Sequence, residues 1–251
     1  MNTGTLDEIT VKEKYMNKIE TLKQFLTKHF LDLDNDGYSG ESIMHPPFEL
    51  SPRDYLQFAE LELESTKHNH LSLINCVSHI KRAMDCQIET FFYSYNLYTF
   101  FKNKRLGIDK KLEFLRESGV FSSRSLSRLN SIRNKMEHEF EVPKIQDIEL
   151  YYDLVSAFIS ILESHILMLE IYAESNWYLK GDDDYLRFSI AFSIKEPIIK
   201  ASWRSKKENV VELVTNLNEI TEFAYFLKAF FLISKTYIHS SKNYIISQIN
   251  N

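Results

Sequence analysis

The scarcity of glycine and proline is the feature that most restricts what this chain can form. Only six glycines and five prolines occur in 251 residues. Because these residues interrupt helices and shape tight turns, their low number leaves room for few turns and for long uninterrupted segments. The 44% hydrophobic and 26% charged content is typical of a globular protein and excludes disordered, collagen-like and disulfide-scaffold classes. We therefore expect a mainly α protein.

Apolar residues recur at three- and four-residue steps in most of the chain, as one face of a helix requires. Proline is tolerated in the first turn of a helix, so Pro52 and Pro143 each mark a helix start. The polar segment from Asp32 to Pro52 predicts a loop. The spacing predicts helices over residues 5–30, 51–67, 71–102, 107–119, 122–139, 143–178 and 217–237.

The period changes after residue 184. Residues 185–193 and 198–203 are rich in aromatic and β-favouring side chains with partial alternation, which predicts a hairpin, and residues 209–215 suit a third strand. We expect three parts: an N-terminal helix and polar loop over 1–50, a helical domain over 51–180, and a small α+β extension over 181–251. The extension would hold a β-hairpin or three short strands plus a helix.

No secretory signal or membrane span is predicted. The N-terminus lacks an apolar core segment, and the most apolar stretch, Leu154 to Ala173, is interrupted by three ionisable residues that are costly in a bilayer. Cys76 and Cys86 would lie about 15 Å apart along one helix, too far for a disulfide. We expect a reduced, cytoplasmic protein with no membrane partner.

One motif carries chemistry. The string Arg133-Asn134-Lys135-Met136-Glu137-His138 is an R-N-x-x-x-H on a predicted helix, followed by Pro143 and a long amphipathic helix. Over residues 51–178 the chain resembles the HEPN superfamily in this motif and in its helical organisation. The resemblance implies an antiparallel helical bundle, a metal-independent endoribonuclease activity and a homodimer with the motif at the dimer cleft.

The resemblance also assigns roles to residues. It implies that His138 is the general acid/base on the ribose 2′-hydroxyl and that Arg133 stabilises the phosphate, with Asn134 and Glu137 in support. Histidine titrates near neutral pH, and the planar arginine fork matches phosphate oxygens. Arg133 lies about 140° from His138 around the helix, so the two converge on one phosphate if the arginine reaches round or a second chain supplies a partner.

Positive charge is concentrated in the segment that precedes the motif along the chain and overlaps its start. The chain carries a net charge of −5, yet ten basic and three acidic residues lie between Phe101 and Lys135. Such a segment suits a phosphodiester-binding groove, although charge runs also serve simply to solvate a surface. The candidate RNA-binding residues are Lys102, Lys104, Arg105, Arg124, Arg128 and Lys135.

Two other clusters of polar residues are weaker candidates for a functional site. The polar face of the 71–102 helix, with His79, Arg82 and Glu89, could belong to the active cleft or be an ordinary wet face. The string Asp32 to Gly37 resembles the start of a calcium loop, but its twelfth position is Ile43 instead of a bidentate glutamate. We predict no metal and no cofactor.

The leading hypothesis is therefore an RNA-cleaving HEPN protein, in the role of a toxin or defence effector that an inhibitor or antitoxin restrains. One alternative is a non-catalytic HEPN module that binds RNA, a nucleotide or a protein partner. Another is a purely structural helical protein, in which Arg133 pairs with Glu137 and His138 lies at the C-terminal end of its helix.

Overall fold

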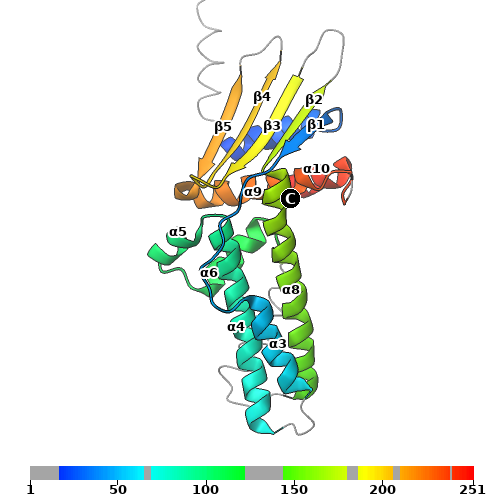
Figure 1. Cartoon of the computed structure of the whole chain (residues 1–251). Helices are drawn as coiled ribbons and strands as arrows, with labels where there is room; N and C mark the ends of the chain where they lie inside the picture. The colour runs from blue at the N-terminus through cyan, green and yellow to red at the C-terminus, as the bar shows by residue number, and fades with distance from the viewer. Residues whose placement is uncertain (1–16, 65–68, 122–143, 180–185, 206–209, 238) are drawn as a thin grey trace, which may run out of the picture. The chain divides into compact units, whose positions relative to one another are not determined.

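A computed structural model describes residues 17–64, 69–121, 144–179, 186–205, 210–237 and 239–251. The chain divides into two compact units. The first, the helical unit, comprises residues 40–173 together with 193–197. The second, the sheet unit, draws on residues 1–39, 174–192 and 198–251. Figure 1 shows the elements of both units in chain order.

The helical unit is built from amphipathic helices whose starts follow the sequence signals. Ser51 and Asp54 form a capping box, in which each side chain accepts from the other residue's backbone N–H, and Pro52 occupies the first turn. The Asn69 side chain caps the next helix by accepting from the Ser72 N–H. The described helices are α3 (Pro52–Leu63), α4 (His70–Ser94), α5 (Tyr98–Asn103), α6 (Ile108–Glu117) and α8 (Ile145–Tyr172).

The predicted helix over residues 71–102 is in fact two helices. α4 ends at Ser94, and Asn96 adopts the left-handed conformation with a φ of 55°. Asparagine tolerates this conformation better than most residues, so it can end a helix where no glycine is present. The N–H of Leu97 then bonds the carbonyl of Phe92 at 2.7 Å, and α5 begins at Tyr98.

The core of the helical unit lies where α4 packs against α3 and α8. Phe91 stacks on Tyr95 with ring centroids 4.4 Å apart, and both side chains are fully buried. The Tyr95 hydroxyl donates a 2.6 Å hydrogen bond to the backbone carbonyl of His165 on α8. Burial raises the pKa of Tyr95 well above its usual value, so the phenol stays a neutral donor at physiological pH.

α8 is long and apolar enough to cross a membrane by length and composition. A core helix of a globular protein meets the same criteria, and α8 makes the contacts of such a helix. Ile148, Val155 and Leu162 are fully buried. On its rim Glu163 accepts two bonds from Arg53 of α3, from Nε at 3.0 Å and from Nη2 at 2.6 Å. We keep the prediction that this segment is a core helix.

The sheet unit contains five antiparallel strands in the order in which they occur along the chain. β1 pairs with β2 across a β-bulge between Asn35 and Gly37. β3 and β4 form the predicted hairpin, and β5 pairs with β4. The strands are β1 (Asp34–Ser39), β2 (Glu174–Leu179), β3 (Leu186–Ser193), β4 (Ile198–Ser205) and β5 (Val211–Asn216).

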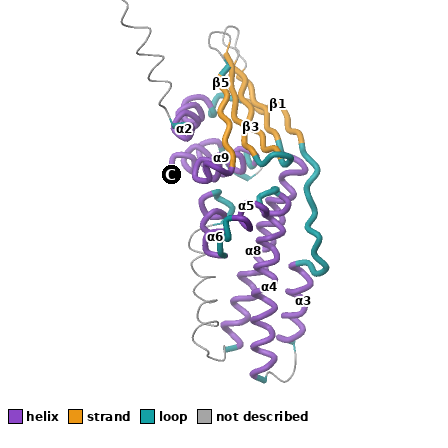
Figure 2. Tube along the Cα trace, turned by 90° about the vertical axis from the view of Figure 1, so that its left-hand side faces the viewer, coloured by secondary structure: helices purple, strands orange, loops and turns teal. Residues whose placement is uncertain are grey.

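Helices cover one face of this sheet, as Figure 2 shows. α2 (Lys18–His29) and α9 (Ile220–Ser234) pack over it, and α10 (Lys242–Asn250) contacts both helices. Phe25 of α2 stacks on Trp203 with centroids 4.2 Å apart, and Phe192 of β3 lies 6.3 Å from Phe230 of α9. Because side chains alternate along a strand, every second residue of β3 and β4 is buried beneath these helices, and Trp177 of β2 lies on the same face.

The predicted fold class is wrong in the weight it gives to the sheet. A mainly α chain with a small α+β extension was expected, whereas a five-stranded sheet, with α2, α9 and α10 among its described helices, forms a unit of its own. β1 comes from the segment predicted as a polar loop, and β2 from residues predicted to continue the 143–178 helix. Neither strand has a strong local signal, because each is stabilised by pairing with a segment distant in sequence.

Candidate functional site

The face of the sheet opposite the helices is lined with polar side chains. On β3 and β4 the exposed or half-buried positions alternate with buried apolar ones. The strand register places Asn176 of β2 across from Ser189 of β3. Ser189 and Ser202 hydroxyls then share a 2.9 Å hydrogen bond between β3 and β4. Asn176, Ser189 and Ser202 thus form a polar row across three strands.

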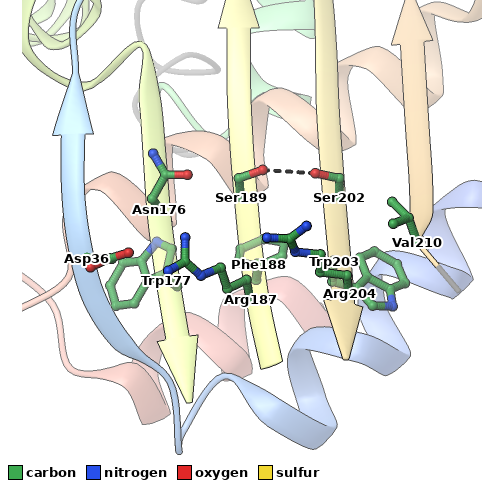
Figure 3. Close-up of a pocket in the computed structure, with 10 residues that line it drawn as sticks. All are labelled: Asp36, Asn176, Trp177, Arg187, Phe188, Ser189, Ser202, Trp203, Arg204 and Val210. Atoms are coloured by element: carbon green, nitrogen blue, oxygen red, sulfur yellow. Dashed lines mark hydrogen bonds between the residues drawn. The ribbon is translucent and has the colours of Figure 1, made fainter. Parts of the chain in front are cut away.

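Two arginines lie beside this row. Because β3 and β4 are antiparallel and Ser189 faces Ser202, the residues two positions along, Arg187 and Arg204, lie across from each other on the same face. Figure 3 shows both side chains next to each other below the serine pair. Like charges directly across a strand pair are unfavourable. The two guanidinium groups are donors that suit carboxylate or phosphate oxygens.

The polar row and the two arginines border a cavity of about 170 Å³. Asp36 of β1, at the bulge, borders it beside Arg187 (Figure 3). The cavity is lined by Asp36, Asn176, Trp177, Arg187, Phe188, Ser189, Ser202, Trp203, Arg204 and Val210. Two guanidinium groups, two hydroxyls and one amide against one carboxylate make the lining rich in hydrogen-bond donors. We call this group of residues the sheet pocket.

The sheet pocket was not found from the sequence. The alternation that places Arg187 and Arg204 on a polar face is visible in residues 185–205, and it correctly predicted the hairpin. Pairing the two arginines requires the register of the hairpin, and adding Asn176 and Asp36 requires two strands that were not predicted. A register hypothesis for the hairpin is the one signal that could have revealed the arginine pair.

The motif predicted from the sequence lies outside the described residues. This applies to the catalytic and supporting candidates Arg133, His138, Asn134 and Glu137, and to the candidate RNA-binding residues Arg124, Arg128 and Lys135. The other three RNA-binding candidates, Lys102, Lys104 and Arg105, are exposed at the end of α5 and just after it. Two of them contact aromatic rings: Lys102 Nζ lies 5.3 Å from the Tyr98 centroid, and Lys104 Nζ lies 5.8 Å from that of Phe100.

The next basic residues along the chain pair with acidic ones. On α6, Lys110 bonds Glu113 at 2.6 Å, and Arg116 lies 3.4 Å from Glu117. Lys111 forms an ion pair with Glu89 of α4, and the lysine of that pair is only 14% exposed. In the described part of the basic segment, the cluster around α5 is therefore better suited to contact a polyanion than α6 is.

The polar face of α4 borders an open groove of about 510 Å³ within the helical unit. Arg82, Asp85, Cys86 and Glu89 line it on the α4 side, and Tyr55 of α3 with residues 47–50 on the other. Glu89 is already paired with Lys111. The groove is thus bordered by both charges and gives no preference for a ligand of one sign.

His79, on the same polar face, has the surroundings of a packed side chain and not of a catalytic one. Its ring packs edge-on against Phe58 with centroids 5.5 Å apart. Its Nδ1 is buried without a hydrogen-bond partner among the described residues. Burial, together with the nearby Arg82 charge, lowers the pKa of His79, which favours the neutral ring over a catalytic cation.

Neither cysteine has the character of a nucleophile. Both are free, and burial raises the pKa of the Cys76 thiol to about 12. Burial also raises the pKa of Cys86, whose thiol lies 3.6 Å from the Leu50 carbonyl. Metal ligation has no support in the described residues, where no three His, Cys, Asp or Glu side chains gather. Residues 34–37 of the calcium-loop-like string form part of β1 instead of a loop.

Comparisons with known proteins add no relative. No family model matches the chain, and no curated protein or solved structure is significantly similar to it.

Proposed function

We propose that the protein is a metal-independent endoribonuclease of the HEPN type that acts as a homodimer. The observation that carries the proposal is the R-N-x-x-x-H spacing of Arg133, Asn134 and His138. The described helices that precede and follow this segment, α6 and α8, belong to the helical unit. A helical unit of this kind is what the HEPN resemblance requires, and the exposed cations near α5 are suited to phosphodiester contact.

The proposed chemistry uses groups of the protein and of the RNA alone. His138 removes the proton of a ribose 2′-hydroxyl, whose oxygen attacks the adjacent phosphorus. The bond from phosphorus to the 5′-oxygen of the next nucleotide breaks, and that oxygen takes up a proton. Arg133 stabilises the negative charge that develops on the phosphate. The products are a 2′,3′-cyclic phosphate and a 5′-hydroxyl.

The dimer has a chemical purpose in this proposal. One histidine cannot remove a proton and donate another in the same step, so His138 of a second copy is suited to protonate the leaving oxygen. The wide angle between Arg133 and His138 on their predicted helix favours the same arrangement, since groups of two copies can then converge on one phosphate.

The test is cleavage of a mixed RNA substrate in EDTA by the wild type, His138→Ala and the control His70→Ala, which removes an exposed histidine of α4. We expect the wild type and the control to cleave equally, and His138→Ala to lose about 10²-fold or more in rate. Size-exclusion light scattering should show the same dimer for all three. A substrate with 2′-deoxyribose at every position should remain intact, because it lacks the attacking hydroxyl.

Two results would overturn this proposal. Cleavage that stops in EDTA would indicate metal-dependent chemistry. Undiminished cleavage by His138→Ala would remove the histidine from the reaction. If instead the wild type binds RNA without cleaving it, the non-catalytic binding module becomes the better interpretation. The sheet pocket favours that second candidate, because its described lining offers two arginines for binding but no histidine or lysine for proton transfer.

A role as a toxin or defence effector extends the proposal. A nuclease that attacks cellular RNA requires restraint, which implies an inhibitor or antitoxin partner. Induced expression should arrest growth for the wild type and not for His138→Ala at equal protein level. Equal arrest by both variants would separate toxicity from the proposed chemistry.

A further inference from the structure

The sheet pocket brings two positively charged side chains together on one face of the sheet. Arg187 and Arg204 lie across from each other on neighbouring strands, an arrangement that costs energy when both are charged. Arginine remains protonated at any physiological pH, so both side chains keep their positive charge. Two guanidinium groups on one face of the sheet offer up to ten N–H donors in a small area.

The surrounding groups complete a set of donors. Asn176 lies at the level of the serine pair, one strand away from Ser189 (Figure 3). The two serine hydroxyls share one hydrogen between them, which leaves the other hydroxyl hydrogen free to donate outward. Amide and hydroxyl donors beside two guanidinium forks match the several acceptor oxygens of a tetrahedral oxyanion.

Among the described lining residues the one acidic group is Asp36, at the β1 side of the pocket, beside Arg187 (Figure 3). With two arginines against one carboxylate, the described lining carries a net formal charge of +1. A carboxylate at this place disfavours a polyanion that spreads over the whole face, and it leaves Arg204 as the stronger attraction for a single anionic group.

We propose that the sheet pocket is a phosphate-binding site, in which Arg187 and Arg204 hold the phosphate group of a ligand and Ser189, Ser202 and Asn176 orient it. The cavity of about 170 Å³ is large enough for a phosphate together with part of an attached group. The phosphate belongs either to a free phosphorylated nucleoside or to a terminal nucleotide of RNA. The site lies outside the R-N-x-x-x-H segment, so the proposal does not rest on nuclease activity.

The chain supplies its own reporter for this site. Both of its tryptophans, Trp177 and Trp203, line the pocket. Titration of the full chain with inorganic phosphate, with adenosine 5′-monophosphate and with a short 5′-phosphorylated RNA should produce a saturable change in tryptophan fluorescence. Isothermal titration calorimetry on the same samples detects binding that leaves the fluorescence unchanged. Potassium chloride at matched ionic strength controls for screening.

The variants separate a specific site from general attraction. Arg187→Gln and Arg204→Gln should each weaken phosphate binding about tenfold or more, because each removes a charge-assisted bond. Lys200→Gln is the matched control: it removes one positive charge from the same face of β4, four residues from Arg204, and should change the affinity less than about twofold. Asp36→Asn should tighten binding by removing a negative charge.

The relative affinities of the ligands identify the source of the phosphate. Tighter binding of adenosine 5′-monophosphate than of the 5′-phosphorylated RNA identifies a free nucleotide, whereas tighter binding of the 5′-phosphorylated RNA identifies an RNA end. The proposal is overturned if none of the three phosphates binds, or if Lys200→Gln weakens binding as much as Arg204→Gln does. His138→Ala should bind phosphate normally, so a failure of the nuclease proposal is distinguishable. Unchanged circular dichroism shows that each variant is folded.

Discussion

The two units of this protein differ in how their segments come together. The helical unit is made from one continuous stretch, residues 40–173, with a short return at 193–197. The sheet unit joins an N-terminal segment to two C-terminal ones, so β1 pairs with β2 between residues 135 positions apart, such as Ser39 and Glu174. Local periodicity is sufficient to find the helices of the first unit. It is insufficient for the second, whose elements depend on distant partners.

The same division provides separate optical signals. Both tryptophans of the chain, Trp177 and Trp203, lie in the sheet unit. Tryptophan emission therefore reports on that unit alone, whereas far-UV circular dichroism at 222 nm reports on the helices of both. Unfolding experiments that record both signals can show whether the two units melt as one or separately.

The largest effect on stability is expected from removing one buried aromatic ring from the core of either unit. Phe188→Ala in β3 and Phe91→Ala in α4 each remove a fully buried ring, and we expect each to lower the free energy of unfolding by about 3–5 kcal/mol. In urea, Phe188→Ala should shift the fluorescence transition and Phe91→Ala mainly the dichroism transition. Equal shifts of both signals in both variants would show that the units unfold as a single cooperative body.

A substitution at Gly40 tests whether the helical unit also depends on a contact between residues distant in sequence. A Cβ atom at Gly40 would lie 1.8 Å from the backbone oxygen of Glu170 near the end of α8. We expect Gly40→Ala to lower the free energy of unfolding by about 1–3 kcal/mol, because backbone must move. Gly107→Ala is the control, since nothing lies within 4 Å of its Cβ position and its φ is −67°.

The control should lower stability by about 0.5–1 kcal/mol, because Gly107 is the N-cap of α6 and alanine is a poorer N-cap than glycine, although no backbone has to move. Thermal melts followed at 222 nm measure both variants. Equal stability of the two would show that the segment after β1 moves away from α8 at little cost.

A smaller effect is expected from pH. The pKa of His79 is lowered by burial and by Arg82, against an opposing contribution of Glu62. Between that lowered pKa and the ordinary value of 6.5, the unfolded chain binds a proton that the folded chain resists. His79 therefore contributes a loss of stability as the pH falls through this window below 6.5, and the loss does not grow further below the folded-state pKa.

Urea unfolding at 222 nm across this window measures the effect. His79→Phe keeps a ring against Phe58 and cannot titrate, so its stability should decline less on acidification than that of the wild type. An identical pH dependence in both proteins would show that His79 is not held neutral.

The smallest effect is expected at the rim of the helical unit. The Arg53–Glu163 ion pair links α3 to α8, but both side chains are partly exposed, 48% and 40% respectively. A double-mutant cycle with Arg53→Met and Glu163→Gln should give a coupling energy of about 0.2–1 kcal/mol that decreases in high salt. A coupling above this range would mean that the rim, and not only the apolar core, determines how the two helices pack.

The elements that the sequence predicts correctly lie mostly in the helical unit. Pro52 and the apolar periodicity correctly predicted α3, and the glycines at 107 and 119 correctly bracketed α6. The break between α4 and α5 was missed, because Asn96 takes the left-handed conformation without a glycine or proline to mark it. β1 was missed for a stronger reason: Asp34-Asn35-Asp36-Gly37 has the composition of a turn, and only pairing with β2 makes it a strand.

The candidate sites divide in a similar way. The R-N-x-x-x-H motif is a local pattern, so the sequence alone revealed it, although Arg133 and His138 lie outside the described residues. The sheet pocket is a non-local arrangement. Arg187 and Arg204 each resemble an ordinary solvent-facing strand residue, and their pairing emerges only once the hairpin register is known.

The long separation between β1 and β2 has a consequence during translation. At about 5–20 residues per second, the ribosome needs on the order of ten seconds to make the partner that lies 135 positions after β1. For that interval β1 is an unpaired strand in a crowded cell, where an apolar strand would invite association with other chains. β1 consists of aspartate, asparagine, glycine, tyrosine and serine, and it carries the charges of Asp34 and Asp36. A strand of this composition resists association with other chains until β2 has been made.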